Sequence, residues 1–280
     1  MKSIYKSASG ESRIQKRYDE QLDQLPVETE HLRVPTSAGE TFVVASGPAG
    51  APPVVLLHGS GANASTWAGD IATWASIFRV YAVDLLGEPG RSAHVRLPLD
   101  SDATATWLDE VLDALEVERV ALVGMSLGGW TALDYGIRRP SRVTRMALLC
   151  PGGIGRQTWG WLPKALLLGA LGRRGLRKTA RLVTGLGDPR TEGILDDVTL
   201  VFSNFNPRTG TLPVFSDSAL QKISVPVQLI VGDRDVMMDS AESADRVARC
   251  IPNASVTVLA GIGHAVLGQT EAVMDFLQSR

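Results

Sequence analysis

A serine between two glycines, placed directly after an apolar run, is the residue in this chain best suited to chemistry. The segment reads Val120-Ala-Leu-Val-Gly-Met-Ser-Leu-Gly-Gly129, and residues compatible with a helix follow it. A Gly-x-Ser-x-Gly pentapeptide between a strand and a helix is typical of a nucleophile elbow, a sharp turn that exposes a serine hydroxyl above a sheet. A Cβ on Gly124 or Gly128 would collide with the chain at such a turn. We therefore predict that Ser126 is a nucleophile.

A serine nucleophile needs a general base, and the chain offers four histidines. His264 lies in a glycine-rich loop directly after the last expected strand, where an imidazole would reach the carboxyl edge of a sheet. His58 belongs to a His-Gly-Ser-Gly turn, and we expect it to shape that turn. His31 and His94 are expected to be ordinary surface residues. We predict that His264 is the base.

The base in turn needs an acid that orients it. Two aspartates follow the penultimate expected strand, in the segment Val231-Gly-Asp-Arg-Asp235. The aspartate nearer a strand more often caps or braces the turn, so Asp233 is expected to have that role. We predict that Asp235 is the orienting acid; the alternative for both aspartates is an exposed turn.

Two backbone amides are candidates for an oxyanion hole, the pair of donors that stabilises negative charge on a reacting carbonyl oxygen. The amide of Leu127 would lie at the N-terminus of the helix that follows Ser126. The second donor should come from the turn after the expected strand at 54–57, and the amide of Ser60 fits best. A tight turn without a catalytic role is the alternative for this segment.

Short apolar runs alternate with helix-like segments along most of the chain, which predicts a parallel sheet with helices on both faces. The alternation stops after Cys150 and resumes near residue 227, so we expect a helical cap over residues 151–217. A helical extension at 1–30 and an α/β core at 31–150 and 218–280 complete the expected organisation. The expected strands are 31–35, 41–45, 54–57, 80–83, 120–123, 146–149, 227–231 and 256–259. The expected helices outside the cap are 9–25, 67–76, 103–115, 127–137, 240–250 and 270–277.

The composition is that of a globular protein that can bury a sizeable core. Of its 280 residues, 44% are hydrophobic and 21% are charged, and the formal net charge is −2. This charge gives no reason to expect nucleic acid or a membrane as a partner. Two distant cysteines predict neither a disulfide framework nor a metal site, and we expect no cofactor. With no signal-peptide pattern or transmembrane run, a cytoplasmic location is expected.

In the order of these motifs the chain resembles an α/β-hydrolase from about residue 31 onward. The elbow, the turn at His58, the loop Asp84-Leu-Leu-Gly-Glu-Pro-Gly-Arg-Ser92, Gly232-Asp-Arg-Asp235 and Gly263-His264 follow the family's order. The loop at 84–92 carries one residue more than is usual, as in bacterial carboxylesterases of the naproxen-esterase type, which the chain is similar to. The resemblance implies an α/β-hydrolase fold with a mostly parallel eight-stranded sheet, a Ser-Asp-His triad and a carboxylic-ester substrate.

Two other functions stay open at this point. Carbon–carbon bond hydrolases share the serine triad and the His-Gly-Ser-Gly turn, but usually continue with Pro-Gly, where this chain has Ala62-Asn63. A small-ligand sensor would retain the triad without repeated turnover. Trp159 and Trp161 in the expected cap are candidates for contact with a small apolar ester, although most such clusters only pack a lid. The basic stretch from Arg173 to Arg181 is expected to be a solvated helix face.

Overall fold

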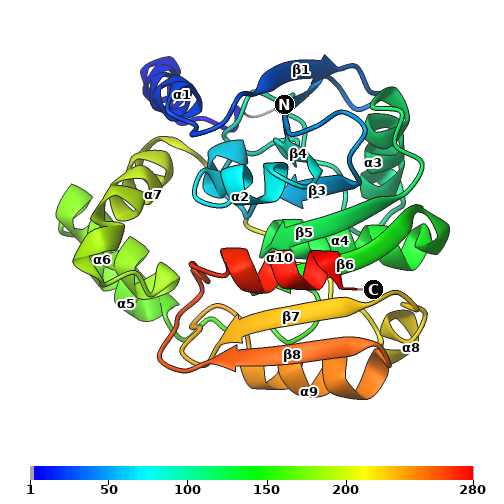
Figure 1. The fold of residues 1–280 in the computed structure, drawn as a ribbon. Coiled ribbons are helices and arrows are strands. Elements are labelled where there is room, and N and C mark those ends of the chain that lie inside the picture. The colour runs from blue at the N-terminus through cyan, green and yellow to red at the C-terminus, as the bar shows by residue number, and fades with distance from the viewer. Residues whose placement is uncertain (1–2, 280) are drawn as a thin grey trace.

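One sheet of eight strands organises the computed structural model, which describes residues 3–279 (Figure 1). The strand order is β1-β2-β4-β3-β5-β6-β7-β8; β1 and β2 pair antiparallel, β2 also pairs antiparallel with β4, and the other neighbours pair parallel. The predicted eight-stranded, mostly parallel sheet is thereby confirmed. The strands are β1 (Glu30–Val34), β2 (Thr41–Ser46), β3 (Pro53–Leu57), β4 (Arg79–Val83), β5 (Val120–Met125), β6 (Val143–Leu149), β7 (Val227–Gly232) and β8 (Ala254–Leu259).

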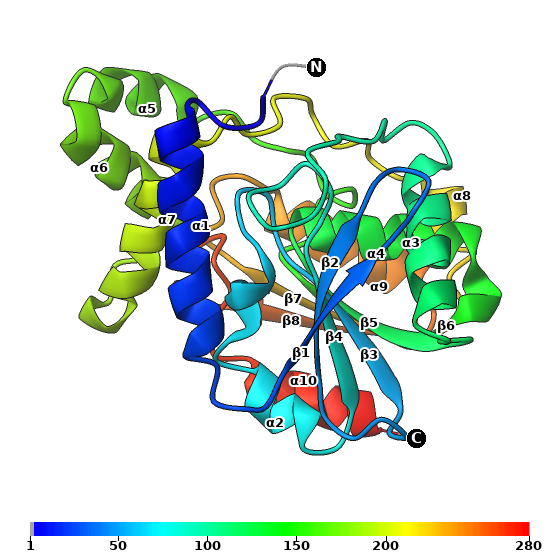
Figure 2. The ribbon, with the colours of Figure 1, turned by 90° about the horizontal axis from the view of Figure 1, so that it is seen from above.

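Helices cover both faces of this sheet (Figures 1 and 2). Alternate residues of β3 show the division: Val55 and Leu57 pack into one core, whereas Val54 and Leu56 pack into the other. Burial on both faces explains why the strands read as continuous apolar runs in the sequence. The first core includes residues of α3 (Ala103–Ala114), α4 (Leu127–Arg138), α8 (Asp217–Leu220) and α9 (Ser240–Cys250), and the second includes residues of α1 (Ala8–Asp23), α2 (Ile71–Ala75) and α10 (Thr270–Gln278).

The helix expected at residues 67–76 is instead two shorter pieces. A 3₁₀ turn at Ala64–Trp67 is followed by a break and then by α2. Gly69 lies in the break, and glycine is among the weakest helix formers. The side chain of Asp70 makes no capping bond and instead accepts a hydrogen bond from the hydroxyl of Thr270. The residue before α2 is thus tied to the first residue of α10.

Between β6 and β7 the chain leaves the sheet and forms a group of helices beside it (Figures 1 and 2). This cap contains α5 (Leu162–Gly169), α6 (Gly172–Thr184), a 3₁₀ turn at Pro189–Thr191 and α7 (Glu192–Asn204). The N-terminal helix α1 lies against α7, where Arg17 and Gln21 both donate to Asp197, with N···O distances of 2.7 and 2.8 Å. No helix within residues 3–279 combines the length and the apolar character needed to cross a bilayer.

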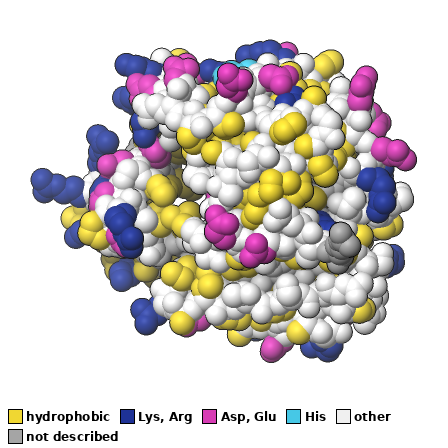
Figure 3. All heavy atoms as spheres, in the orientation of Figure 1, with side chains coloured by type: hydrophobic (Ala, Val, Ile, Leu, Met, Phe, Trp, Pro, Cys, Tyr) yellow, Lys and Arg dark blue, Asp and Glu magenta, His cyan; other side chains and the backbone are white. Residues whose placement is uncertain are grey.

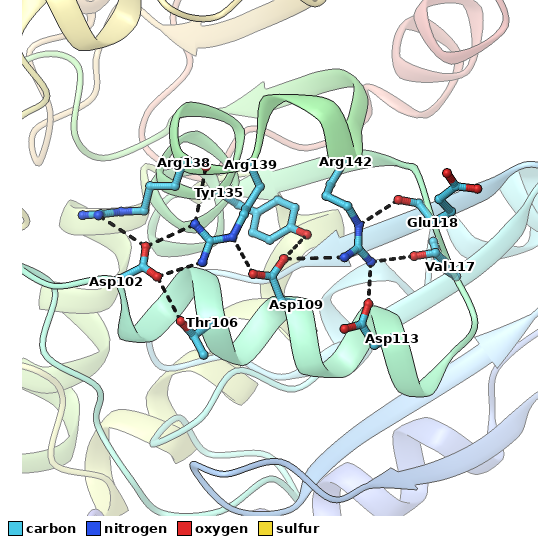
Figure 4. Close-up of polar contacts among 10 residues, drawn as sticks. All are labelled: Asp102, Thr106, Asp109, Asp113, Val117, Glu118, Tyr135, Arg138, Arg139 and Arg142. Atoms are coloured by element: carbon cyan, nitrogen blue, oxygen red, sulfur yellow. Dashed lines mark hydrogen bonds and ion pairs between the residues drawn. The ribbon is translucent and has the colours of Figure 1, made fainter.

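A polar network fixes the far end of α4 against α3 (Figure 4). Arg139 donates to Asp102 and Asp109, with N···O distances of 2.7 and 2.5 Å. Tyr135 donates to the other oxygen of Asp109 at 2.8 Å. These carboxylates raise the pKa of Arg139, first because Asp102 accepts a hydrogen bond from its guanidinium. The network holds in place the helix whose first turn follows Ser126.

Candidate active site

Ser126 lies in a sharp turn between β5 and α4, with a φ of 53° and a ψ of −109°. Such a backbone conformation is strained for any residue other than glycine. A Cβ on Gly124 would lie 2.5 Å from the carbonyl oxygen of Gly128, and a Cβ on Gly128 would lie 1.9 Å from that of Leu57. The predicted need for glycine at both positions is confirmed. The turn therefore presents the serine hydroxyl at the start of a helix.

Three side chains from separate loops form one hydrogen-bonded chain. His264 Nε2 lies 2.9 Å from Ser126 Oγ, and His264 Nδ1 lies 2.7 Å from Asp235 Oδ2. The side chain of Asp235 is fully buried and that of His264 is 13% exposed. Asp235 Oδ1 accepts the amides of Met237 and Met238 at 2.7 and 3.1 Å. This arrangement can move a proton from the serine hydroxyl to the imidazole while the carboxylate fixes the ring.

The two aspartates after β7 have different environments. Asp233 is exposed, and its Oδ1 accepts the amide of Gly261 at 2.7 Å, so it braces the loop after β8. Asp235 is the one that contacts the imidazole. The structure thus places Asp233 in the turn-bracing position expected for it and brings Asp235 to His264.

The cap supports the loop that carries His264. The amide of Ala265 donates to the carbonyl of Thr184, the last residue of α6, at 2.8 Å. Gly185 follows with a φ of 76°, and a Cβ on Gly185 would lie 2.7 Å from the Cα of Gly263. The end of α6 and the histidine loop therefore pack directly against each other, with no room for a side chain between the two glycines.

The remaining histidines are placed as the sequence indicated. His58 is buried; its Nδ1–H donates to the carbonyl of Gly59 at 2.8 Å, and its Nε2 accepts the amide of Leu85 at 2.9 Å. Burial lowers the pKa of His58 to about 4, so the ring is neutral near pH 7. It shapes the turn after β3. His31 and His94 are exposed.

The turn after β3 lies beside the serine, since a Cβ on Gly59 would be 3.5 Å from the Cβ of Ser126. Leu127 is the first residue of α4, a position whose amide has no partner inside the helix. The amide of Ser60 donates to no group within residues 3–279, whereas that of Gly61 donates to Glu88 Oε2 at 2.6 Å. Of these two turn amides, only that of Ser60 is left without a partner in the described chain.

Glu88 is a residue of this site that the sequence analysis missed. Its Oε2 also accepts the hydroxyl of Ser60 at 3.2 Å, and the residue is 1% exposed. Burial raises the pKa of Glu88 to about 7, although the Gly61 amide acts in the opposite direction. The extra residue in the loop at 84–92 was the available signal, because an insertion beside the oxyanion turn brings new groups to it.

Trp159 and Trp161 lie on the segment that joins β6 to the cap. Their rings stack with centroids 6.5 Å apart. The indole of Trp161 donates to the carbonyl of Thr158 at 3.1 Å, and the amide of Thr158 donates to the carbonyl of Met237 at 2.8 Å. The pair is therefore anchored near Asp235, with Trp159 47% exposed. Contact of these rings with a substrate stays a prediction.

Known proteins match this chain over most of its length. The model of the alpha/beta hydrolase family matches residues 54–276. Carboxylesterase YbfK of Bacillus subtilis is 31% identical over 271 residues, which cover 93% of this chain and 90% of that protein. A 2-hydroxy-6-oxononadienedioate/2-hydroxy-6-oxononatrienedioate hydrolase of Cupriavidus pinatubonensis is 30% identical over 238 residues, which cover 77% of this chain and 81% of that protein.

The fold agrees with these matches. The crystal structure of naproxen esterase (carboxylesterase NP) from Bacillus subtilis superposes with a TM-score of 0.83 at 29% identity, and the match covers 98% of this chain and 100% of that chain. The resemblance to Bacillus carboxylesterases is confirmed. The sheet, the elbow motif and the family match lead to one conclusion: the chain belongs to the alpha/beta hydrolase family.

Proposed function

We propose that this protein hydrolyses carboxylic esters through an acyl-enzyme formed on Ser126. The observation that carries the proposal is the hydrogen-bonded chain from Ser126 Oγ to His264 at 2.9 Å and from His264 to Asp235 at 2.7 Å. Two further features support it: relatives named carboxylesterases, and the amide of Ser60 beside the serine, which has no partner among residues 3–279.

In the first half-reaction, Ser126 Oγ attacks the carbonyl carbon of the ester while His264 Nε2 takes the hydroxyl proton. The amides of Ser60 and Leu127 stabilise the negative charge on the carbonyl oxygen. Collapse of the tetrahedral intermediate breaks the bond to the alcohol oxygen, which leaves with the proton from His264. The alcohol is released and the acyl group stays on Ser126.

In the second half-reaction, His264 takes a proton from water, and the resulting hydroxide attacks the acyl carbon. The bond between that carbon and Ser126 Oγ breaks, and the serine regains its proton from His264. Asp235 remains ionised throughout and stabilises the imidazolium. The acid is released, so each cycle consumes one ester and one water.

The proposed substrate is a small apolar ester, with Trp159 and Trp161 in contact with its acyl or alcohol group. Stacked indoles supply a large rigid apolar surface, and ligand sites are lined mostly by such groups. Their position next to the Asp235 loop supports this role. Trp159→Ala and Trp161→Ala should then change the ranking of esters that differ in acyl length and aromaticity, without loss of folding. An unchanged ranking in both folded variants would assign the indoles to packing.

Steady-state turnover of a p-nitrophenyl ester tests the proposal. We expect many turnovers by the native protein and none above background by Ser126→Ala. Release that stops at one equivalent would instead indicate a sensor that retains the triad.

A carbon–carbon bond hydrolase is the second candidate, because the Cupriavidus relative named for such a substrate is 30% identical. Turnover of a 2-hydroxy-6-oxo-dienoate separates the two activities. We expect kcat/KM to be far lower for the dienoate than for the ester. The reverse ranking would assign the carbon–carbon activity.

A further inference from the structure

Helix α5 of the cap and the turn that joins it to α6 expose leucines that nothing in the described chain covers. Leu166, Leu167 and Leu171 are 71, 78 and 55% exposed, and α5 contains no buried residue. Isolated exposed leucines are ordinary, but three within six positions form an apolar surface that water must solvate. We call these three leucines the cap leucines.

Four cations lie on the same pair of helices as the cap leucines. Lys164 lies within α5, and Arg173, Arg174 and Lys178 lie on α6, the next helix; all four are exposed. Within residues 3–279 none of the four forms an ion pair, whereas Arg181, on the same helix, pairs with Glu192 of α7 at 2.6 Å. The sequence has no acidic residue from 156 to 187. Figure 3 shows Lys and Arg side chains along the outer edge of the cap.

The formal net charge of the whole chain is −2, so this positive charge is local to the cap. We propose that the cap leucines and these four cations, which together we call the cap patch, dock the protein on an anionic phospholipid surface. Leucines beside lysines and arginines are the combination that lets a helix lie in a bilayer interface, with the apolar side chains among the acyl chains and the cations at the lipid phosphates.

A second copy of the chain fits the cap patch less well. In a twofold-symmetric dimer the same surface meets itself, so the four unpaired cations of one copy would face those of the other. Such like-charge contacts oppose association. An anionic lipid surface instead neutralises the cations while it covers the leucines.

Docking also has a consequence for the enzyme. Helix α6 carries three of the four cations, and its last residue, Thr184, accepts the amide of Ala265 next to His264. A cap held at a bilayer would keep the loop of His264 close to a phase in which apolar esters concentrate. The docking inference itself does not depend on the proposed esterase activity.

Co-sedimentation with vesicles tests the inference on the full chain. One set contains phosphatidylcholine alone, and the other contains equal parts of phosphatidylcholine and phosphatidylglycerol. We expect binding to the mixed vesicles only, and binding should weaken as sodium chloride screens the charges. Equal binding to both sets, or to neither, overturns the proposal.

Variants then test whether the cap patch is the contact. Leu166→Gln and Leu167→Gln should each weaken binding by about tenfold, and Arg173→Gln and Arg174→Gln by about fivefold each. Ile77→Gln and Arg119→Gln are matched controls, since they alter exposed residues outside the cap and should bind like the native chain. Unchanged binding by the four cap variants overturns the proposal.

Folding and self-association are measured on the same samples. Each variant should keep the native thermal midpoint, which separates lost docking from lost folding. Sedimentation velocity reports the oligomeric state. A native dimer that dissociates in Leu166→Gln and Leu167→Gln, with no vesicle binding by the native chain, would assign the cap leucines to an interface between copies and overturn the proposal.

Discussion

The carboxylate of Glu88 accepts the backbone amide of Gly61 at 2.6 Å, directly next to the candidate oxyanion donor Ser60. Because Ser60 precedes Gly61 in the chain, this bond restricts the backbone of Ser60. The second contact of Glu88, with the hydroxyl of Ser60 at 3.2 Å, restrains the same residue. Glu88 therefore acts on the site by positioning the turn.

Loss of this acceptor should impair turnover more than binding. We expect Glu88→Ala to lower kcat by about 10–100-fold with little change in KM, since a misplaced oxyanion donor acts mainly in the transition state. Glu88→Gln keeps a side-chain oxygen that can accept the Gly61 amide, so it should retain most of kcat. An equal fall in kcat in both variants would show that turnover depends on the charge of Glu88 rather than on its hydrogen bond to the Gly61 amide.

Glu88 also predicts how stability depends on pH. Burial raises its pKa from 4.5 to about 7, so the folded protein holds this proton more tightly than the unfolded chain does. Between these two values the unfolded chain loses the proton first, and the contribution of Glu88 to the free energy of unfolding falls as pH rises. Urea unfolding from pH 4.5 to 8 should therefore show Glu88→Gln gaining stability relative to the native protein up to about pH 7. A difference that stays constant with pH would contradict the prediction.

The two aspartates after β7 should differ sharply in activity. Asp235→Asn should lower kcat by about 10⁴-fold, because an amide at this place favours the wrong tautomer of His264. Asp233→Asn keeps an oxygen that can accept the Gly261 amide, and it should cost about tenfold or less. Steady-state kinetics on one ester compares the two. A larger loss in Asp233→Asn would contradict the assignment of Asp235.

The sequence was sufficient for features that depend on local pattern. Runs of apolar residues predicted the strands from β3 onward, a turn between two extended segments predicted β1 and β2, and the two elbow glycines are explained by backbone contacts that any such turn requires. Contacts between distant segments were not predictable from local pattern. Asp70, in the break before α2, accepts the hydroxyl of Thr270, and the bond from Ala265 to Thr184 joins the core to the cap.

The glycine contact between the cap and the histidine loop should tolerate no side chain. Gly185→Ala would place a Cβ 2.7 Å from the Cα of Gly263, at a φ of 76°. We expect kcat to fall by about tenfold or more, because the loop that carries His264 must shift. Gly187→Ala is the matched control, since a Cβ there meets nothing within 4 Å. Similar kcat values for the two variants would show that the cap and the histidine loop are not coupled.

Covalent labelling tests the central claim most directly. The native protein and Ser126→Ala are treated with a serine-directed phosphonate, digested and mapped by mass spectrometry. The account predicts one phosphonate per native chain, on the peptide that contains Ser126, and none on Ser126→Ala. Stoichiometric labelling of another residue, or labelling that persists unchanged in Ser126→Ala, would contradict it.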